Sequence, residues 1–259
     1  MKDIPLVSVI TPLFNSEKYI AKTIKSIASQ TYENWELIVV DDASKDSSAT
    51  IVEQFAEEDS RILLKKLDSN KGAAYCRNLA TELSKGVFIS FLDADDLWHP
   101  EKLERQIGFM QVHDCAVSFT SYVHMDAEGN LLGKRIKAME TLSEEKQKTN
   151  NYIGNLTGVY NAKTLGKVVA PNLRKRQDWA LWYTAIQKSG KPARGILEDL
   201  ALYRVSEDSM SANKRKLIGY NFQFYRRFLG YSWLKSVIWL LRFFWEYFLL
   251  RPKQIEYYK

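Results

Sequence analysis

Short apolar segments alternate with segments of helical periodicity through the first 98 residues, and this alternation constrains the fold more than any other feature. The predicted strands are residues 6–11, 35–40, 61–67 and 87–92, and the predicted helices between them are residues 16–30, 47–58 and 72–84. Strands that alternate with helices form βαβ units, because a parallel neighbour needs a crossover connection. The sequence therefore predicts an α/β fold with a mainly parallel central sheet flanked by helices.

Polar residues follow each of the four predicted strands. The clusters are Thr11–Asn15, Asp41–Ser44, Asp68–Gly72 and Asp93–Asp96. Asp and Asn favour turns, so one such cluster alone would be typical of a simple turn. The carboxyl ends of parallel strands meet at one edge of a sheet, where α/β proteins bind their ligands. Four clusters in register therefore indicate a ligand site at this edge.

Three carboxylates, Asp93, Asp95 and Asp96, fall within four positions directly after an apolar strand. Like charges this close repel each other unless a cation or hydrogen-bond donors offset them. Mg²⁺ and Mn²⁺ prefer oxygen ligands and leave coordination positions for substrate phosphates. The spacing predicts that Asp93 and Asp95 hold one divalent cation, while Asp96 stabilises the N-terminus of the next helix. An acidic helix cap is the alternative for the whole cluster.

Beyond residue 98 the pattern is less regular. The predicted elements are a helix over 100–113, a strand over 115–126, a hairpin turn at 128–130, a mobile loop over 139–153, a helix over 176–190 and a strand over 201–205. Cys76 and Cys115 lack a metal-binding spacing, so we expect two buried, reduced thiols.

The C-terminal tail, residues 213–259, holds ten Lys/Arg and two acids, a net charge of +8, whereas the whole chain carries +6. The main body is therefore slightly acidic and gives no indication of nucleic-acid binding. Fourteen of the eighteen residues in 233–250 are apolar or aromatic, but charges interrupt them too often for a membrane span. We expect an amphipathic helix that lies on an anionic membrane surface through residues 214–259. Packing on the catalytic domain or on a second subunit is the alternative.

Six motifs in order resemble glycosyltransferase family 2, whose members have the GT-A fold. They are "VSVITPLFNSEKYI", "IVVDDASKDSS", "NKGAAYCRNLA", "FLDADDLW", "RQDWALW" and "YRVSEDSMSANK", spread over roughly residues 5–213. Within the family, the chain is most similar to bacterial enzymes that extend surface polysaccharides such as teichuronic acids, capsules or O-antigens. The resemblance implies a GT-A catalytic domain over 1–212, with a nucleotide-binding half over 1–98 and an acceptor half over 99–212, followed by the helical tail.

The resemblance also implies roles for individual residues. The nucleotide-sugar would contact Pro12, Phe14, Asn15, Glu17, Asp41, Asp42, Lys71, Gly72, Arg77, Asp93, Ala94 and Asp95. Asp41 or Asp42 would accept from the base, and Lys71 and Arg77 would lie by the diphosphate. Asp95, with Asp93, would hold Mn²⁺ or Mg²⁺, and Asp178 would be the general base.

Acceptor or phosphate contacts are expected from Gln177, Trp179, Trp182, Arg204 and Ser209, with core packing as the alternative for the two tryptophans. The chain departs from the family pattern at Ser206, where many relatives have His. A third protein ligand for the metal is therefore in doubt.

The implied activity is inverting, metal-dependent transfer of a sugar from a nucleotide diphosphate donor, a UDP-sugar, to a lipid-linked or polysaccharide acceptor. The enzyme would work at the cytoplasmic face of the bacterial membrane, as a monomer or homo-oligomer. A sugar-phosphate nucleotidyltransferase and a non-catalytic nucleotide-sugar binding protein are the alternatives. The segment "TPLFNSEKYI" lacks the Gly-rich basic loop common in the first class, and Asp178 argues against the second.

Overall fold

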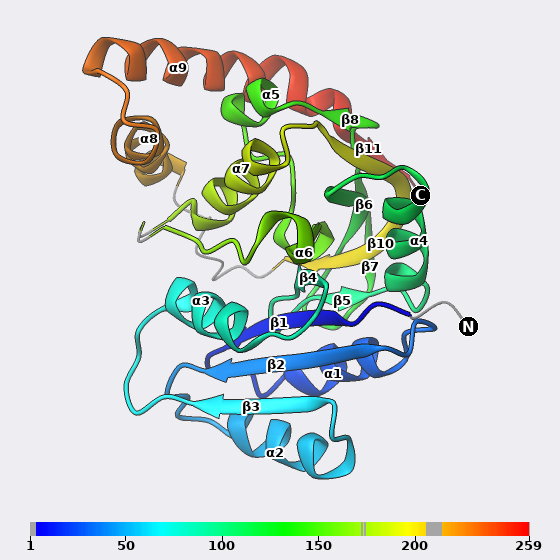
Figure 1. The fold of residues 1–259 in the computed structure, drawn as a ribbon. Helices are drawn as coiled ribbons and strands as arrows, with labels where there is room; N and C mark the ends of the chain where they lie inside the picture. The colour runs from blue at the N-terminus through cyan, green and yellow to red at the C-terminus, as the bar shows by residue number, and fades with distance from the viewer. Residues whose placement is uncertain (1–3, 172, 174, 206–213, 259) are drawn as a thin grey trace.

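The computed structural model of the protein describes residues 4–171, 173, 175–205 and 214–258. Within these residues the strands form one eleven-stranded sheet with helices on both faces (Figure 1). The predicted α/β class is therefore confirmed.

The first half of the chain forms the predicted βαβ units. Its elements are β1 (Val7–Leu13), α1 (Ile20–Ala28), β2 (Trp35–Asp41), α2 (Ser48–Glu58), β3 (Ile62–Lys66), α3 (Ala73–Leu83) and β4 (Phe88–Phe91). All of these strands pair in parallel, in the spatial order β4-β1-β2-β3. Each predicted strand and helix is present.

Alternation along the strands divides the core into two layers. Val7, Val9 and Leu13 of β1 pack on one face in a cluster with α1, α2 and α4. Ile10 of the same strand packs on the other face in a cluster with α3 and α7. Successive side chains of a strand point to opposite faces, so a strand covered on both sides must be apolar along its whole length. This explains the continuous apolar runs in the sequence.

The second half of the sheet is mixed rather than parallel. Its elements are β5 (Leu97–Trp98), α4 (Lys102–Val112), β6 (Val117–Met125), β7 (Leu131–Ile136), β8 (Thr141–Leu142), α5 (Glu144–Thr149), η1 (Asn155–Thr157), β9 (Val159–Asn161), α6 (Ala162–Leu165), α7 (Gln177–Ser189) and β10 (Ala193–Arg204). Strand β9 lies antiparallel between β4 and β6, and β6 forms the predicted hairpin with β7. Among the strands of this half, β10 runs parallel to β6.

The predicted mobile loop over 139–153 is wrong. This segment contains β8 and α5, and the side chains of Leu142, Gln147 and Ile153 are fully buried. Its polar composition conceals these core contacts, because several charged residues of α5 are used in ion pairs, such as Lys146 with the buried Glu246 and Lys148 with Glu144. Cys76 and Cys115 are buried and unpaired, as predicted.

The tail packs against the main body of the chain. It contains α8 (Lys214–Gln223), the π-helical η2 (Phe224–Phe228), α9 (Trp233–Trp245), the π-helical η3 (Glu246–Leu250), the short η4 (Arg251–Gln254) and β11 (Ile255–Tyr257). The ring of Phe224 stacks on Trp179 of α7 at 4.0 Å. Strand β11, which the sequence did not predict, pairs with β7 and extends the sheet. The tail is thus built into the domain.

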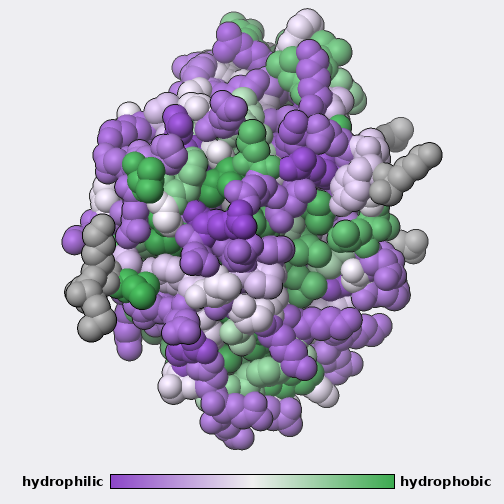
Figure 2. Space-filling view, turned by 90° about the vertical axis from the view of Figure 1, so that its right-hand side faces the viewer, coloured by the Kyte–Doolittle hydropathy of each residue, from purple (hydrophilic) through white to green (hydrophobic). Residues whose placement is uncertain are grey.

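Helix α9 and η3 carry apolar residues on two sides. Ser236, Trp239, Phe243 and Glu246 form the buried side. The other side is an apolar stripe at helical spacing, which we call the outer stripe: Leu234, Ile238, Leu241, Trp245 and Phe248, each at least half exposed. Figure 2 shows hydrophobic surface at the top of the molecule, the level at which α9 lies in Figure 1. In the described part of the chain, no helix is long and apolar enough to cross a membrane.

Changing Gly158 to alanine should destabilise the fold. A Cβ at this position would lie 2.2 Å from Cζ2 of Trp182, which is fully buried against Phe91. Overpacking of this kind costs about 1–3 kcal/mol, so we expect a lower midpoint of thermal unfolding. Gly108→Ala, in helix α4 where an added Cβ meets nothing within 4 Å, is the control and should leave the midpoint unchanged or raised. Equal midpoints for Gly158→Ala and wild type would contradict the packing described here.

Candidate active site

The carboxyl ends of the first strands meet at one edge of the sheet. Leu13 at the end of β1 aligns with Asp41 at the end of β2, which aligns in turn with Lys66 of β3. On the other side of β1, Ile10 aligns with Phe91 at the end of β4. The four polar clusters therefore follow strand ends at a single edge, as predicted.

The loops after β1 and β2 are tied together by side chains. The amide of Asn15 donates to Ser44 Oγ at 3.0 Å, and Asn15 Oδ1 accepts from the amide of Lys45 at 2.8 Å. Glu17 Oε2 accepts from the amide of Ser47 at 2.9 Å. Next to them, Phe14 is 47% exposed and Pro12 is half-buried. Asn15 and Glu17 thus shape the rim, and Phe14 has an accessible ring face beside it.

Two aspartates at the end of β2 organise the neighbouring loops. Asp41 Oδ1 accepts from Ser44 Oγ at 2.5 Å. The carboxylate of Asp42 accepts from the amides of Lys71 at 2.6 Å and Gly72 at 2.8 Å. Gly72 has φ 89°, a conformation that favours glycine. The two hydrogen bonds hold the Lys71–Gly72 segment in place and leave the side chain of Lys71 exposed.

The acidic turn after β4 is balanced by a guanidinium. Arg77 Nη2 donates to Asp93 Oδ1 at 2.6 Å, and the Arg77 side chain is largely buried. Asn155 Nδ2 lies 3.4 Å from the same oxygen. Asp95 has no comparable partner among the described residues: burial, and then the charge of Asp93, raise the pKa of Asp95 to about 6. Ala94 between them is buried, and its carbonyl accepts from Thr23 of α1 at 2.9 Å.

Asp96 and Arg204 have structural roles that the sequence did not predict. Asp96 is 2% exposed, and its Oδ1 accepts from the amide of Arg204 at 2.8 Å, so it joins β10 to the turn and does not cap helix α4. Burial raises the pKa of Asp96 well above its ordinary value, and the charges of Asp95 and Asp93 add to this effect. Arg204 is also buried, and its guanidinium donates to the carbonyls of Asp95, Asp126 and Ala127. Arg204 therefore supports the main chain of the turn, while its Nη2 has no hydrogen-bond partner among the described residues, and its predicted contact with phosphate stays a prediction.

Asp178 lies in the first turn of α7. Asn151 Nδ2 donates to Asp178 Oδ2 at 2.7 Å. The negative charges of Asp93 and Asp178 both act on Arg77 and favour its charged form. The charges of the candidate base and of the D-x-D motif therefore act on one guanidinium, although Asp178 lies 83 positions after Asp95 in the sequence.

The two tryptophans of α7 belong to the core. Trp179 and Trp182 are fully buried, and Trp179 Nε1 donates to the carbonyl of Gln147 at 2.6 Å. Neither indole has a free face for a sugar, so the predicted stacking is wrong and the alternative of core packing holds. Gln177 is half-buried and donates to the carbonyl of Leu173. Ser209 and Ser206 lie outside the described residues.

The donor groups at the turn fit a divalent cation that is completed by substrate. In the described part of the chain, no group of three or more His, Cys, Asp or Glu side chains could hold a metal alone. Asp93 and Asp95 supply carboxylate oxygens, and the raised pKa of Asp95 indicates negative charge that a cation would offset. Magnesium-type sites commonly use one or two carboxylates together with substrate phosphates, so the residues present fit such a site.

Two asparagines at the site were not predicted. Asn151 contacts Asp178, and Asn155 contacts Asp93 while its own Oδ1 is buried without a hydrogen-bond partner among the described residues. The signal was the polar run "TNNYIGN" that joins α5 to η1. We assigned most of this run to a loop, because its composition is also typical of loops.

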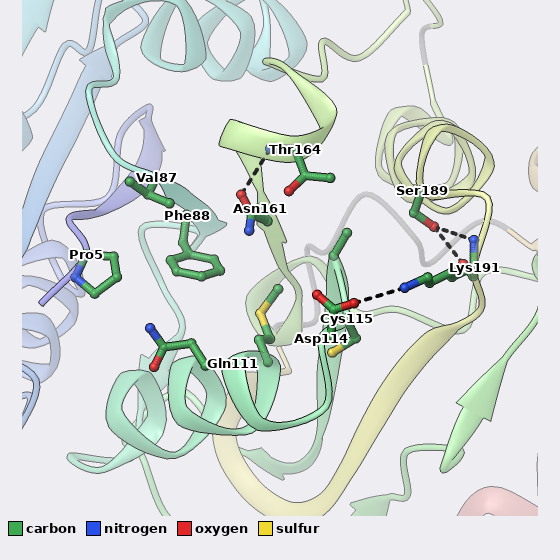
Figure 3. A pocket seen from close by; sticks show the side chains of 12 residues that line it. Pro5, Val87, Phe88, Gln111, Asp114, Cys115, Asn161, Thr164, Ser189 and Lys191 are labelled. Carbon is green, nitrogen blue, oxygen red and sulfur yellow. Dashed lines mark hydrogen bonds and ion pairs between the residues drawn. The ribbon is translucent and has the colours of Figure 1, made fainter. Parts of the chain in front are cut away.

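A cavity of about 440 Å³ lies away from this site, at the opposite edge of the sheet (Figure 3). It is bordered by Pro5 and Val87, which precede β1 and β4. Its charged residues already pair with each other, since Lys191 Nζ lies 3.0 Å from Asp114 Oδ2. None of the predicted site residues lines it.

Comparison with known proteins agrees with the geometry. The family described as Glycosyl transferase family 2 matches residues 8–170. The chain belongs to glycosyltransferase family 2. This family 2 enzyme is 40% identical to TuaG of Bacillus subtilis (strain 168), named as a teichuronic acid biosynthesis glycosyltransferase, over 90% of this chain and 92% of TuaG. It is 36% identical to WfgD of Escherichia coli, over 82% of this chain and 81% of WfgD. WfgD is named UDP-Glc:alpha-D-GlcNAc-diphosphoundecaprenol beta-1,3-glucosyltransferase.

Solved structures agree on the fold of this family 2 enzyme. The crystal structure of S. aureus TarS 1-349 in complex with UDP-GlcNAc superposes with a TM-score of 0.72 at 21% identity, over 93% of this chain and 73% of TarS 1-349. The mannosyltransferase PcManGT from Pyrobaculum calidifontis, in complex with GDP-Man and Mn²⁺, superposes with a TM-score of 0.70 at 17% identity, over 98% and 72%. The predicted GT-A fold is confirmed.

Replacing Arg204 by lysine should loosen the acidic turn. Lysine cannot reproduce the planar fork that reaches three carbonyls, so we expect a loss of about 1–3 kcal/mol in the free energy of unfolding. Thermal denaturation measures this loss. Arg194→Lys on the same strand is the control, because the Arg194 Nε has no hydrogen-bond partner among the described residues. Equal destabilisation by the two changes would show that Arg204 has no special role.

Proposed function

We propose that the protein is an inverting, metal-dependent glycosyltransferase that moves a sugar from a UDP-sugar to a lipid-linked acceptor in bacterial surface glycan synthesis. One observation carries this proposal: the Arg77 guanidinium pairs with Asp93 of the D-x-D turn, and the charge of Asp178 also acts on this guanidinium. The same site thus holds carboxylates that could bind a metal for the charged leaving group and a carboxylate, Asp178, that could accept a proton. The names of TuaG and WfgD support the pathway and the acceptor class.

The donor is assigned to the edge formed by the ends of β1, β2 and β4. The accessible ring of Phe14 lies beside the loop that Asn15 and Glu17 hold, so the nucleoside would lie against it. The carboxylates of Asp41 and Asp42 are at the same edge. UDP-GlcNAc in TarS and GDP-Man in PcManGT support a nucleotide diphosphate donor, and WfgD supports UDP.

In the proposed reaction, the acceptor hydroxyl oxygen attacks the anomeric carbon from the face opposite the diphosphate. The new carbon–oxygen bond forms as the bond from the anomeric carbon to the diphosphate oxygen breaks, so the configuration inverts. The leaving nucleoside diphosphate keeps the electron pair of the broken bond. Asp178 takes the hydroxyl proton, and Asn151 orients it by holding Oδ2 at 2.7 Å.

Asp95, together with Asp93, is the proposed holder of Mn²⁺ or Mg²⁺. A cation bound there would offset the charge that develops on the leaving diphosphate. Arg77 keeps Asp93 in position, and Arg204 fixes the main chain of the turn through the carbonyl of Asp95. The turn is therefore preorganised by this chain's own residues.

The two parts of the sheet support the predicted division into a nucleotide half and an acceptor half. Residues 1–98, with the parallel strands, would bind the nucleotide, and residues 99–212, with the mixed strands and Asp178, would bind the acceptor. The predicted boundary with the tail, at 212, lies outside the described residues. A nucleotidyltransferase is the second candidate, and it would release inorganic pyrophosphate instead of a nucleoside diphosphate.

Asp178→Asn tests the catalytic assignment. The amide has the same shape and can still accept from Asn151, but it cannot take a proton, so turnover should fall by about 10²–10⁴-fold. A screen of nucleotide sugars with Mn²⁺, read by thermal stabilisation, identifies the donor. The release of nucleoside diphosphate from that donor then measures the loss of turnover. Donor binding should stay within about twofold of wild type.

The control for this change is Asp114→Asn, at the opposite edge of the sheet, where the side chain is 94% exposed. Full turnover by Asp178→Asn would remove this residue from the mechanism. Pyrophosphate release would favour the nucleotidyltransferase instead.

The outer stripe is the proposed membrane contact. Its Leu, Ile, Trp and Phe side chains are exposed, whereas the opposite side of α9 is buried on the domain. The side chain of Arg242 beside the stripe is 59% exposed, and Lys235 and Lys253 are also exposed. Apolar and basic side chains on one surface helix fit the interface of an anionic bilayer. This would bring the site to the cytoplasmic face of the membrane, where a lipid-linked acceptor is presented.

The double variant Leu241→Glu with Trp245→Glu should lose membrane binding. Both residues are more than 60% exposed, so the change places charge in the lipid contact without disturbing the core. Flotation with vesicles containing anionic phospholipid should recover wild type and leave the variant at the bottom of the gradient. Val112→Glu, at a residue 80% exposed on α4, should float like wild type. If wild type does not float but forms a dimer that the double variant cannot form, the outer stripe contacts a second copy of the chain instead.

A further inference from the structure

The tail forms one wall of a cavity beside the candidate active site. This cavity, which we call the tail pocket, has a volume of about 910 Å³ and joins three segments of the chain. Its lining is Lys71, Gly72, Ala74, Tyr75 and Asn78 from the start of α3, Pro171, Leu173 and Gln177 from the approach to α7, and Gln223, Arg227 and Phe228 from the tail. Sequence reasoning assigned no role in the site to the last three.

The charges of the tail pocket favour an anion. Lys71 and Arg227 are exposed and form no ion pair with any residue that the structure describes, and the described lining contains no acidic residue. The main-chain amide of Lys71 is held by Asp42, so this cation is anchored at its base. Two unpaired cations across one cavity suit a diphosphate, which carries charge on several oxygens.

Part of the remaining lining is apolar and would suit a hydrocarbon chain, although Asn78, Gln177 and Gln223 also line the pocket. Tyr75 is 48% exposed, and Leu173 and Phe228 are partly exposed beside it. The tail pocket thus combines a charged part and an apolar part, the two chemical features of a prenyl diphosphate.

The tail wall is held firmly against the domain. Arg176 Nε donates to Asn221 Oδ1 at 2.7 Å, and Tyr225 Oη donates to the carbonyl of Lys148 at 2.9 Å. Phe228 packs edge-on against Tyr183 of α7. These contacts lie on both sides of Arg227 in the sequence. Its main chain is therefore fixed, and its guanidinium can serve as a stable part of a binding site.

The tail pocket lies next to the proposed base and the proposed donor loop, and the tail continues from it to helix α9. Gln177 in its lining precedes Asp178, the proposed base, and Gly72 belongs to the proposed donor loop. On the tail side, Phe228 is five residues before Trp233, which is 65% exposed at the start of α9. One molecule could therefore extend from the base, across the pocket, toward the helix that carries the outer stripe.

We infer that the tail pocket binds the diphosphate and first isoprenoid units of the lipid-linked acceptor, with Arg227 and Lys71 on the phosphates and Tyr75 and Phe228 on the hydrocarbon. This inference rests on the proposed function, since it deepens the acceptor side of that reaction. It gives the tail a part in acceptor recognition and reassigns Lys71 from the donor diphosphate, where the family resemblance placed it, to the acceptor. The donor diphosphate stays with the D-x-D turn and Arg77.

The test uses farnesyl diphosphate as a soluble prenyl diphosphate and inorganic diphosphate as the probe without a hydrocarbon chain. Calorimetric titration of the full chain, with Mg²⁺ and with or without saturating UDP, measures the dissociation constants. Arg227→Gln should weaken farnesyl diphosphate binding by at least about tenfold, the loss of one charge-assisted contact. Tyr75→Ser should weaken farnesyl diphosphate while leaving inorganic diphosphate unchanged.

Arg226→Gln is the matched control. Arg226 is the adjacent cation, is exposed, donates to the carbonyl of Tyr231, and is not among the residues that line the pocket. The Arg226→Gln variant should bind farnesyl diphosphate and inorganic diphosphate with the dissociation constants of wild type. The affinity for UDP should be unchanged in all variants. The inference is overturned if wild type does not bind farnesyl diphosphate, if Arg227→Gln matches Arg226→Gln, or if UDP displaces the prenyl diphosphate. Failure of the proposed function would appear separately, as an absence of nucleoside diphosphate release from every nucleotide sugar.

Discussion

The site depends on how the chain balances three carboxylates at the end of a buried strand. Two guanidiniums do so in different ways. Arg77 pairs directly with Asp93, whereas Arg204 binds the main chain of the turn, and its own amide donates to Asp96. Asp95 remains without such a partner, and its pKa is raised to about 6 by burial and by the charge of Asp93. Partial neutralisation leaves one carboxylate suited to bind a cation that arrives with substrate.

The tail connects this site to the outside of the molecule. Its inner side forms an aromatic cluster with α7, in which Trp179 and Phe224 stack, and its last strand extends the sheet. Its outer side leaves a row of exposed apolar residues on α9. The tail therefore packs against α7, the helix that carries Asp178. It also lines the tail pocket and provides the proposed membrane contact. A substrate that is part lipid and part sugar would need these features together.

Much of the fold and part of the site followed from the sequence. The alternation of strands and helices predicted β1 to β4, and the position of polar clusters after them predicted the edge at which the site lies. Side-chain roles were harder to predict. Asp96 and Asp95 are adjacent and identical in type, yet Asp96 is fully buried against the amide of Arg204 and Asp95 is only partly buried. Trp179 and Trp182 match a sugar-binding pattern equally well, but both are buried.

The sequence by itself determined the α/β class, the edge that carries the polar residues and the D-x-D motif, because these depend on local periodicity and on residue chemistry. Asp178 became a candidate only through the resemblance of its motif to glycosyltransferase family 2. The tertiary structure decided which polar groups form hydrogen bonds that hold loops together and which remain available to a ligand. It also decided that Asn151 and Asn155 join the site and that Arg227 lines a pocket beside it. Such roles depend on contacts between residues far apart in the chain, and no local pattern encodes which of several similar side chains will be buried by them.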